Sequence, residues 1–115
     1  MDFPILFNLK VSPMYLVQIL LPLYTNERQL FPDDAYDRVR ETLTERFGGV
    51  TAYQRSPALG HWKQTEAVTI RDDIVVFEVM LETLDRAWWA GYREQLRQTF
   101  RQDKLIVRAL PFESL

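Results

Sequence analysis

Two almost uninterrupted apolar stretches constrain the fold of this chain more than any other feature. The first, YLVQILLPL, covers residues 15–23, and the second, IVVFEVML, belongs to a longer extended segment at residues 67–82. Both are rich in valine, isoleucine and leucine, and that composition over this length favours buried β-strands over helices. An antiparallel sheet with helices on one side normally alternates apolar and polar residues along each strand. The two stretches therefore predict a sheet whose second face is also covered.

Helical periodicity follows each of these stretches. Pro32 and the two aspartates after it suit the first turn of a helix, and Gly48 suits its end, which predicts a helix over residues 33–47. Asp85 is the expected cap of a second helix. The apolar stripe of that helix is formed by Trp89, Tyr92, Leu96 and Phe100.

Two shorter strands complete the pattern. Alternating residues at 50–55 predict one strand, and residues 104–110 predict the last, whose extension Pro111 should limit. The charged run at 71–73 interrupts the alternation of the long segment and predicts a bulge or bend.

The resulting order of elements, β-α-β-β-α-β, predicts an α+β, ferredoxin-like domain over residues 14–115. In that fold the antiparallel sheet has the strand order 4-1-3-2, and both helices lie on one face. Residues 1–13 are expected to form an N-terminal arm or a short extra strand, because their apolar side chains are costly to leave in water. A start codon assigned too early is the open alternative.

The face turned away from the helices is expected to be apolar except for one polar residue on each of three strands. These residues are Gln18, Glu78 and Arg108. If about 400–600 Å² of apolar surface lies there, its burial is worth roughly 10–15 kcal/mol before the cost of association. Monomers do not normally expose such a patch. We therefore expect a second copy of the chain to cover it, as in dimeric α+β barrels; the arm, the loop at 56–66 or a hydrophobic ligand are the alternatives.

Charged groups on such a face need partners. Gln18 lies between the other two in the predicted order, so a row from Arg108 through Gln18 to Glu78 is expected, because a direct pair would span about 9–10 Å. One interpretation is a satisfied network that sets the register of the dimer. The other is a pocket in which Arg108 binds an anionic or carbonyl ligand and Glu78 moves a proton. Tyr53 and Arg55, on the neighbouring strand, are expected to line the same space.

Two further features of the sequence each allow a functional interpretation and a simpler one. His61 and Trp62, beside a loop with proline and glycine, suggest a lid with His61 as a general base, but a single loop histidine is more often solvated. Arg93, Arg97 and Arg101 at spacing four suggest a phosphate or RNA surface, but a solvated helix face explains them more simply. The net charge is −2 and the third strand lacks the glycine and aromatic run of an RNA-recognition motif, so nucleic acid is not an expected partner.

The composition of the chain excludes several kinds of chemical site. The chain has no cysteine and a single histidine, which excludes disulfides, thiolate metal sites and poly-histidine cages. We expect no cofactor and no metal. No stretch approaches the roughly 18 uninterrupted apolar residues of a membrane span, and Asp2 stands where a signal peptide needs positive charge. A cytoplasmic protein without a membrane partner is the expectation.

Three segments together resemble an uncharacterised bacterial family of short α+β domains: RFGGVTAYQRSPALGHWK (46–63), RDDIVVFEVM (71–80) and LDRAWWAGYREQL (84–96). The resemblance runs from about Met14 to the last strand, and it implies a ferredoxin-like fold but no particular activity. At the level of fold, the pattern is similar to dimeric α+β barrels such as the antibiotic-biosynthesis monooxygenase and muconolactone isomerase groups. Members of those groups hold small aromatic or hydrophobic ligands between helices and sheet or in the barrel, although fold does not confer chemistry.

The sequence thus predicts a small homodimeric domain that binds a small organic or anionic ligand, and a cofactor-independent enzyme is compatible with that prediction. The alternative is a structural or protein-interaction dimer with no catalytic activity. The candidate ligand-binding residues are Gln18, Tyr53, Arg55, His61, Trp62, Glu78 and Arg108.

Overall fold

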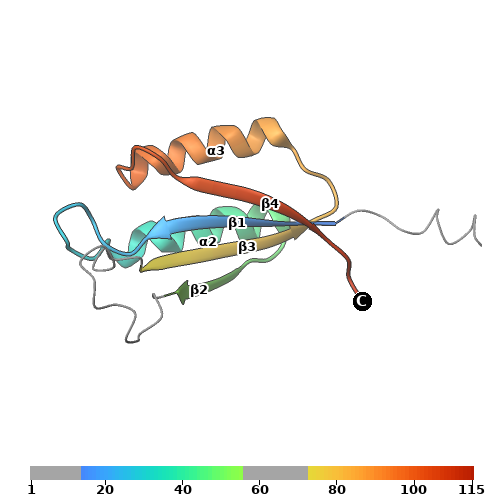
Figure 1. Cartoon of the computed structure of the whole chain (residues 1–115), viewed down its shortest axis with the longest axis horizontal. Helices are drawn as coiled ribbons and strands as arrows, with labels where there is room; N and C mark the ends of the chain where they lie inside the picture. Colours follow the sequence, from blue (N-terminus) through green and yellow to red (C-terminus); the bar gives the residue numbers. More distant parts are fainter. Residues whose placement is uncertain (1–13, 56–72) are drawn as a thin grey trace, which may run out of the picture.

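The computed structural model describes residues 14–55 and 73–115 of the chain. The elements are β1 (Met14–Pro22), α2 (Asp33–Phe47), β2 (Thr51–Arg55), β3 (Ile74–Leu81), α3 (Arg86–Thr99) and β4 (Ile106–Phe112), as labelled in Figure 1. This is the predicted order β-α-β-β-α-β. The expected arm at residues 1–13 and the loop at 56–66 lie outside the described residues.

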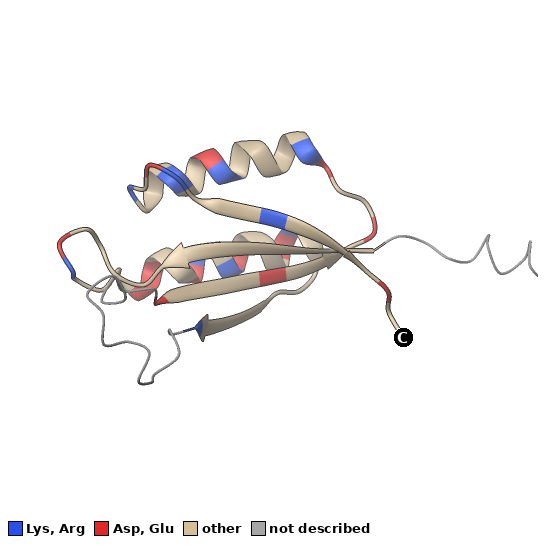
Figure 2. Cartoon of the chain, viewed as in Figure 1, with Lys and Arg blue, Asp and Glu red and all other residues tan. Residues whose placement is uncertain are grey.

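All three strand pairings are antiparallel, and the strands lie in the order β2-β3-β1-β4. This is the predicted order 4-1-3-2 read from the other edge, so the α+β fold class and its sheet order are confirmed. The two apolar stretches of the sequence form the two central strands, β1 and β3. The charged residue of β4 and that of β3 both lie near mid-strand, with the uncharged β1 between them (Figure 2).

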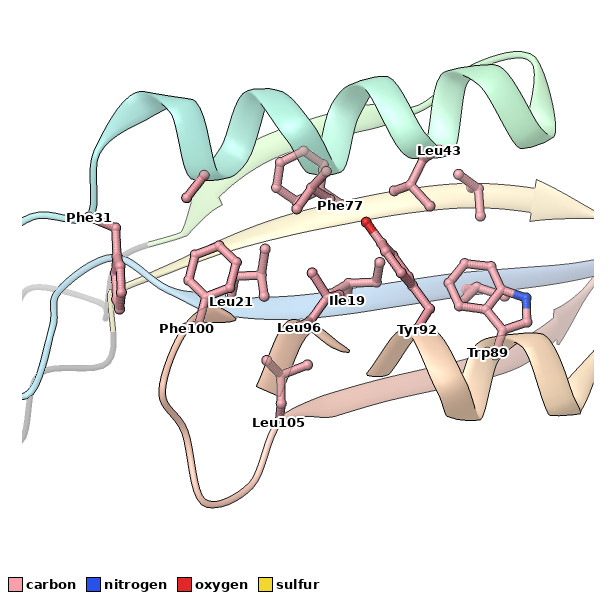
Figure 3. Packing of buried hydrophobic residues seen from close by; sticks show 14 of the residues in the cluster. Ile19, Leu21, Phe31, Leu43, Phe77, Trp89, Tyr92, Leu96, Phe100 and Leu105 are labelled. Atoms are coloured by element: carbon pink, nitrogen blue, oxygen red, sulfur yellow. The ribbon is translucent and has the colours of Figure 1, made fainter. Parts of the chain in front are cut away.

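The core lies between this sheet and the two helices. Ile19 and Leu21 of β1 and Phe77 of β3 are almost fully buried, in one cluster with Leu43 of α2 and Leu96 of α3 (Figure 3). The predicted apolar stripe of the second helix is buried in the same cluster: Trp89, Tyr92, Leu96 and Phe100. The odd-numbered residues of β1 and β3 therefore face the helices, and the even-numbered residues form the opposite side, which we call the open face.

The helix ends agree with their sequence signals, with one difference. Gly48 adopts a left-handed conformation with φ of 86°, and its N–H donates to Thr44 O at 2.8 Å, which ends α2. The Asp85 carboxylate accepts a 3.1 Å hydrogen bond from the backbone N–H of Trp88 and so caps α3. The capping position of α2 is occupied by Pro32, which has no side-chain acceptor. The aspartates after it sit in the first turn, where their charge favours the positive end of the helix dipole.

Two features differ from the predictions. β4 continues through Pro111 to Phe112. The prediction that Pro111 limits the strand was wrong, because β4 is an outer strand of the described sheet, where a missing backbone N–H is tolerated. Arg101 lies beyond the end of α3 with φ of 53°, so it does not continue the helical row of Arg93 and Arg97. The bulge or bend predicted at 71–73 stays a prediction, because residues 71 and 72 lie outside the described residues; Asp73 is buried, and its backbone oxygen accepts from Leu23 N at 3.2 Å.

Candidate functional site

A continuous row of hydrogen bonds crosses the open face at mid-strand. Nε of Arg108 donates to Oε1 of Gln18 at 2.7 Å, and Nε2 of Gln18 donates to Oε2 of Glu78 at 2.7 Å. The hydroxyl of Tyr53 donates to the same oxygen of Glu78 at 2.9 Å. We call these four residues the polar row. It links side chains from all four strands.

The register of the sheet explains most of this row. Gln18 is opposite Glu78 in the β1–β3 pair and opposite Arg108 in the β1–β4 pair, so the three side chains emerge on one line across the strands. Thr51, not Tyr53, is opposite Glu78 in the β2–β3 pair. Tyr53 therefore reaches Glu78 diagonally from its place opposite Val76, a separation that a long aromatic side chain can span.

The polar row leaves some of its hydrogen-bonding atoms without a partner among the described residues. Glu78 accepts two hydrogen bonds through Oε2, and Arg108 uses only Nε, so within the described residues its two terminal nitrogens make no hydrogen bond. The pKa of Tyr53 is raised above 10.0, chiefly because its hydroxyl donates to Glu78, and further by partial burial and by the charge of Glu78. Tyr53 thus remains a hydrogen-bond donor at neutral pH. The free guanidinium nitrogens of Arg108 leave donors for an acceptor from outside the monomer.

Apolar side chains surround the row on the open face. Met80 is 66% exposed, Ile106 53%, Tyr53 42% and Leu110 41%. Outside this face, Leu30 and Leu115 are the other large hydrophobic residues exposed to this degree in the described part of the chain. Exposed apolar surface is thus concentrated around the polar row.

A hollow of about 400 Å³ adjoins Glu78. It is bordered by Thr51, Leu16 and Met80, and by Gly48 and Gly49 at the end of α2. It forms because β2 begins only at Thr51, so residues 79–81 of β3 are not paired with β2. A space of this size next to a carboxylate has the dimensions of a small-molecule site.

The predicted site residues divide into three groups. The structure brings together Gln18, Glu78, Arg108 and Tyr53. Arg55 is exposed at the end of β2, opposite Ile74, and makes no hydrogen bond to the row. Its positive charge only partly opposes the rise in the pKa of Tyr53. His61 and Trp62 lie outside the described residues. The hollow beside Glu78 was not predicted, because its glycines and Thr51 carry no signal beyond a helix end and a strand start.

Two other properties bear on this site. In the parts of the chain that are described, no three acidic or histidine side chains come together as a metal site requires. None of the helices in those parts is long and apolar enough to cross a membrane.

Comparison with known proteins assigns neither a family nor a function to this chain. No family model matches the chain, and no curated protein matches it. Among solved structures, the chain is similar to a phage SAM lyase in complex with S-methyl-5'-thioadenosine, with 14% identity and a TM-score of 0.49 over 88% of this chain and 90% of that chain. It is also similar to a phage SAM lyase in the apo state, with 11% identity and a TM-score of 0.39 over 90% of each chain. No function is transferred from similarities this low, and the resemblance to an uncharacterised bacterial family stays a prediction.

Proposed function

We propose that this protein is a homodimeric ligand-binding domain, in which two open faces pack together and hold a small organic or anionic molecule beside the polar row. The observation that carries the proposal is the hydrogen-bonded row itself, which sets a cation and a carboxylate among exposed apolar side chains. A dimeric α+β barrel is the corresponding assembly.

The exposed apolar residues support a second copy as the partner. Met80 and Leu110 lie on one line across the strands with Leu16, and Ile106 lies on another with Leu20. Packing these two lines against an identical surface removes them from water and leaves the polar row between them. A central polar band flanked by apolar residues then sets the register of the two sheets.

The charges of the polar row also make it complementary to a copy of itself. Arg108 on β4 and Glu78 on β3 stand on either side of Gln18. A twofold axis parallel to β1 and passing over Gln18 places Arg108 of each copy opposite Glu78 of the other copy. An axis along the row would instead place Arg108 against Arg108. Charge complementarity therefore favours the first arrangement.

The ligand is inferred from the groups that the row leaves open. Arg108 has two terminal nitrogens, so one can meet Glu78 of the other copy while the second suits a carboxylate, phosphate or carbonyl oxygen of the ligand. Oε1 of Glu78 can likewise accept from Arg108 of the other copy and from a donor group of the ligand. The hollow of about 400 Å³ beside Glu78 has room for the body of such a molecule. If the bound ligand undergoes a proton-transfer reaction, Glu78 is the group that would accept the proton, because Tyr53 is held protonated.

Native mass spectrometry of freshly purified full-length protein tests both parts of the proposal. We expect a dimer of about twice the 13.7 kDa chain mass, carrying an additional small-molecule mass. In the variant Glu78→Gln the additional mass should disappear, and the dimer should be weakened but still held by its apolar contacts, whereas the surface control Glu41→Gln should retain both the mass and the full dimer. A monomer without any bound molecule would contradict the proposal.

The second candidate is a structural or protein-interaction dimer without a ligand. It is favoured by the fact that every member of the polar row already has a partner within one chain. In that case Glu78→Gln would weaken the dimer, and no additional mass would accompany the unaltered protein.

A further inference from the structure

A second cavity, of about 240 Å³, lies between α3 and β4. Val17 and Val107, which face the helices, provide apolar walls, and Trp89 of α3 borders the space. Two small residues, Ala90 of α3 and Ala109 of β4, leave the space open where larger side chains would fill it. Arg108 borders this cavity as well as the polar row because it lies on an outer strand of the sheet.

Two arginines flank the cavity on the helix. Arg86, Ala90 and Arg93 follow one another at positions i, i+4 and i+7, so they lie on one face of α3, and the arginines are about 10 Å apart along the axis. Figure 2 shows basic residues recurring along α3. An alanine between two arginines makes an apolar space with a cationic group at each end.

These two arginines differ from the next one on the helix. Arg97 is bound by Glu94 at 2.7 Å and by the backbone oxygen of Gln102 at 3.1 Å. Among the described residues, neither Arg86 nor Arg93 makes a hydrogen bond or an ion pair. Their guanidinium groups are therefore free to bind an anion at this cavity.

A third observation comes from Trp89. Its indole N–H is buried and has no hydrogen-bond acceptor among the described residues. In Figure 3 the ring nitrogen of Trp89 lies on the side away from Tyr92, toward the beginning of α3, where Leu84 and Arg86 border the cavity. Buried donors without acceptors are rare, and an acceptor atom of a ligand in the neighbouring space would satisfy this one.

We propose that the cavity between α3 and β4 binds a small amphipathic anion, with an apolar body between Ala90 and Ala109 and an acidic head group at one of the two flanking arginines, Arg86 and Arg93. A single- or double-ring aryl carboxylate has a matching size and polarity. The apolar walls and the two helix arginines lie on the helix side of the sheet, so the site does not require the dimer, and Arg108 is the one residue that it shares with the polar row.

The probe is 2-naphthoate, titrated into ¹⁵N-labelled full-length protein. We expect binding at about 1 mM or tighter. The backbone amides of α3 and β4 should shift, together with the indole N–H of Trp89. The neutral 2-naphthamide should bind at least about tenfold more weakly, because it lacks the charge that the arginines recognise.

Two variants and two matched controls locate the site. Ala90→Leu fills the cavity and should abolish the shifts, whereas Ala87→Leu, an exposed alanine on the same helix, should leave them unchanged. The double variant Arg86→Gln with Arg93→Gln should weaken binding at least about tenfold without changing the rest of the spectrum, whereas Arg38→Gln on α2 should have no effect. Absence of binding, unchanged binding in Ala90→Leu, or shifts confined to the open face would each overturn the proposal.

Discussion

Gln18 and Glu78 face each other across β1 and β3, and Nε2 of Gln18 donates to Oε2 of Glu78 at 2.7 Å. This bond orients the amide, because it turns Oε1 of Gln18 toward β4, where it accepts from Arg108. A neutral side chain thus connects a cation and an anion that stand two strand spacings, about 9–10 Å, apart. Glutamine suits this position because its amide donates at one atom and accepts at the other.

Replacing Gln18 with leucine removes both connecting hydrogen bonds while retaining a side chain of similar size. We expect the dissociation constant of the dimer to rise at least about tenfold, because groups that meet in the interface lose their partners. The free energy of unfolding of the separated monomer should change by less than about 1 kcal/mol, because the row is partly hydrated there. Sedimentation velocity over a dilution series measures the first quantity, and urea unfolding measures the second. The control is Gln54→Leu, an exposed glutamine on the other face of β2; the same loss of affinity in both variants would contradict the role of the row.

Placing a charge at Met80 tests the open face directly. Met80 is 66% exposed, so Met80→Glu should leave the monomer folded but should shift the protein to monomers, because an unpaired carboxylate would be buried in the interface. The matched control is Leu30→Glu, since Leu30 is 62% exposed and lies outside the open face. Light scattering after size-exclusion chromatography measures the molar mass of the eluted protein. Dimers that survive Met80→Glu unchanged would place the interface elsewhere.

The hydrogen bond from Tyr53 to Glu78 predicts a shifted titration. The pKa of Tyr53 is raised above 10.0, chiefly because ionisation breaks its hydrogen bond to the Glu78 carboxylate. In Glu78→Gln this pKa should fall toward its ordinary value, since the amide carries no charge. The tyrosinate absorbance of the two proteins, each compared with its Tyr53→Phe derivative, isolates this residue. Identical curves would show that the carboxylate does not control the hydroxyl.

Tyr36 predicts a decline of stability in alkali. Its hydroxyl donates to the backbone oxygen of Pro22 at 2.6 Å, and burial, followed by the charge of Asp33, raises its pKa from 10.0 to about 12. The unfolded chain therefore loses this proton at lower pH than the folded chain does. The stabilisation is complete below pH 10.0 and is lost as the pH rises through about 12.

The variant Tyr36→Phe should lose about 1 kcal/mol of unfolding free energy at neutral pH. Its difference from the unaltered protein should shrink above pH 10.0, because ionisation of Tyr36 stabilises the unfolded form of the unaltered protein there, whereas phenylalanine cannot ionise. Urea unfolding at several alkaline pH values measures both trends. A difference that stays constant through that range would mean that Tyr36 does not titrate as described.

Much of the candidate site could be predicted because strand periodicity is simple. Side chains alternate between faces, so Gln18, Glu78 and Arg108 share a face once the strand order is known. The hollow beside Glu78 could not be predicted in this way. It depends on where β2 begins relative to β3, and that boundary is set by packing as well as by Gly48 and Gly49.

The sequence alone determined the order of elements, the faces of the central strands and the ends of the helices, because these follow from local hydrophobic periodicity and capping residues. Only the tertiary structure decided that Tyr53 joins Glu78 diagonally, that Arg101 leaves the helical row, and that Ala90 and Ala109 border one cavity. These outcomes depend on how segments distant in sequence pack against one another. The periodic pattern of a single segment does not specify the cavities and side-chain contacts that this packing produces.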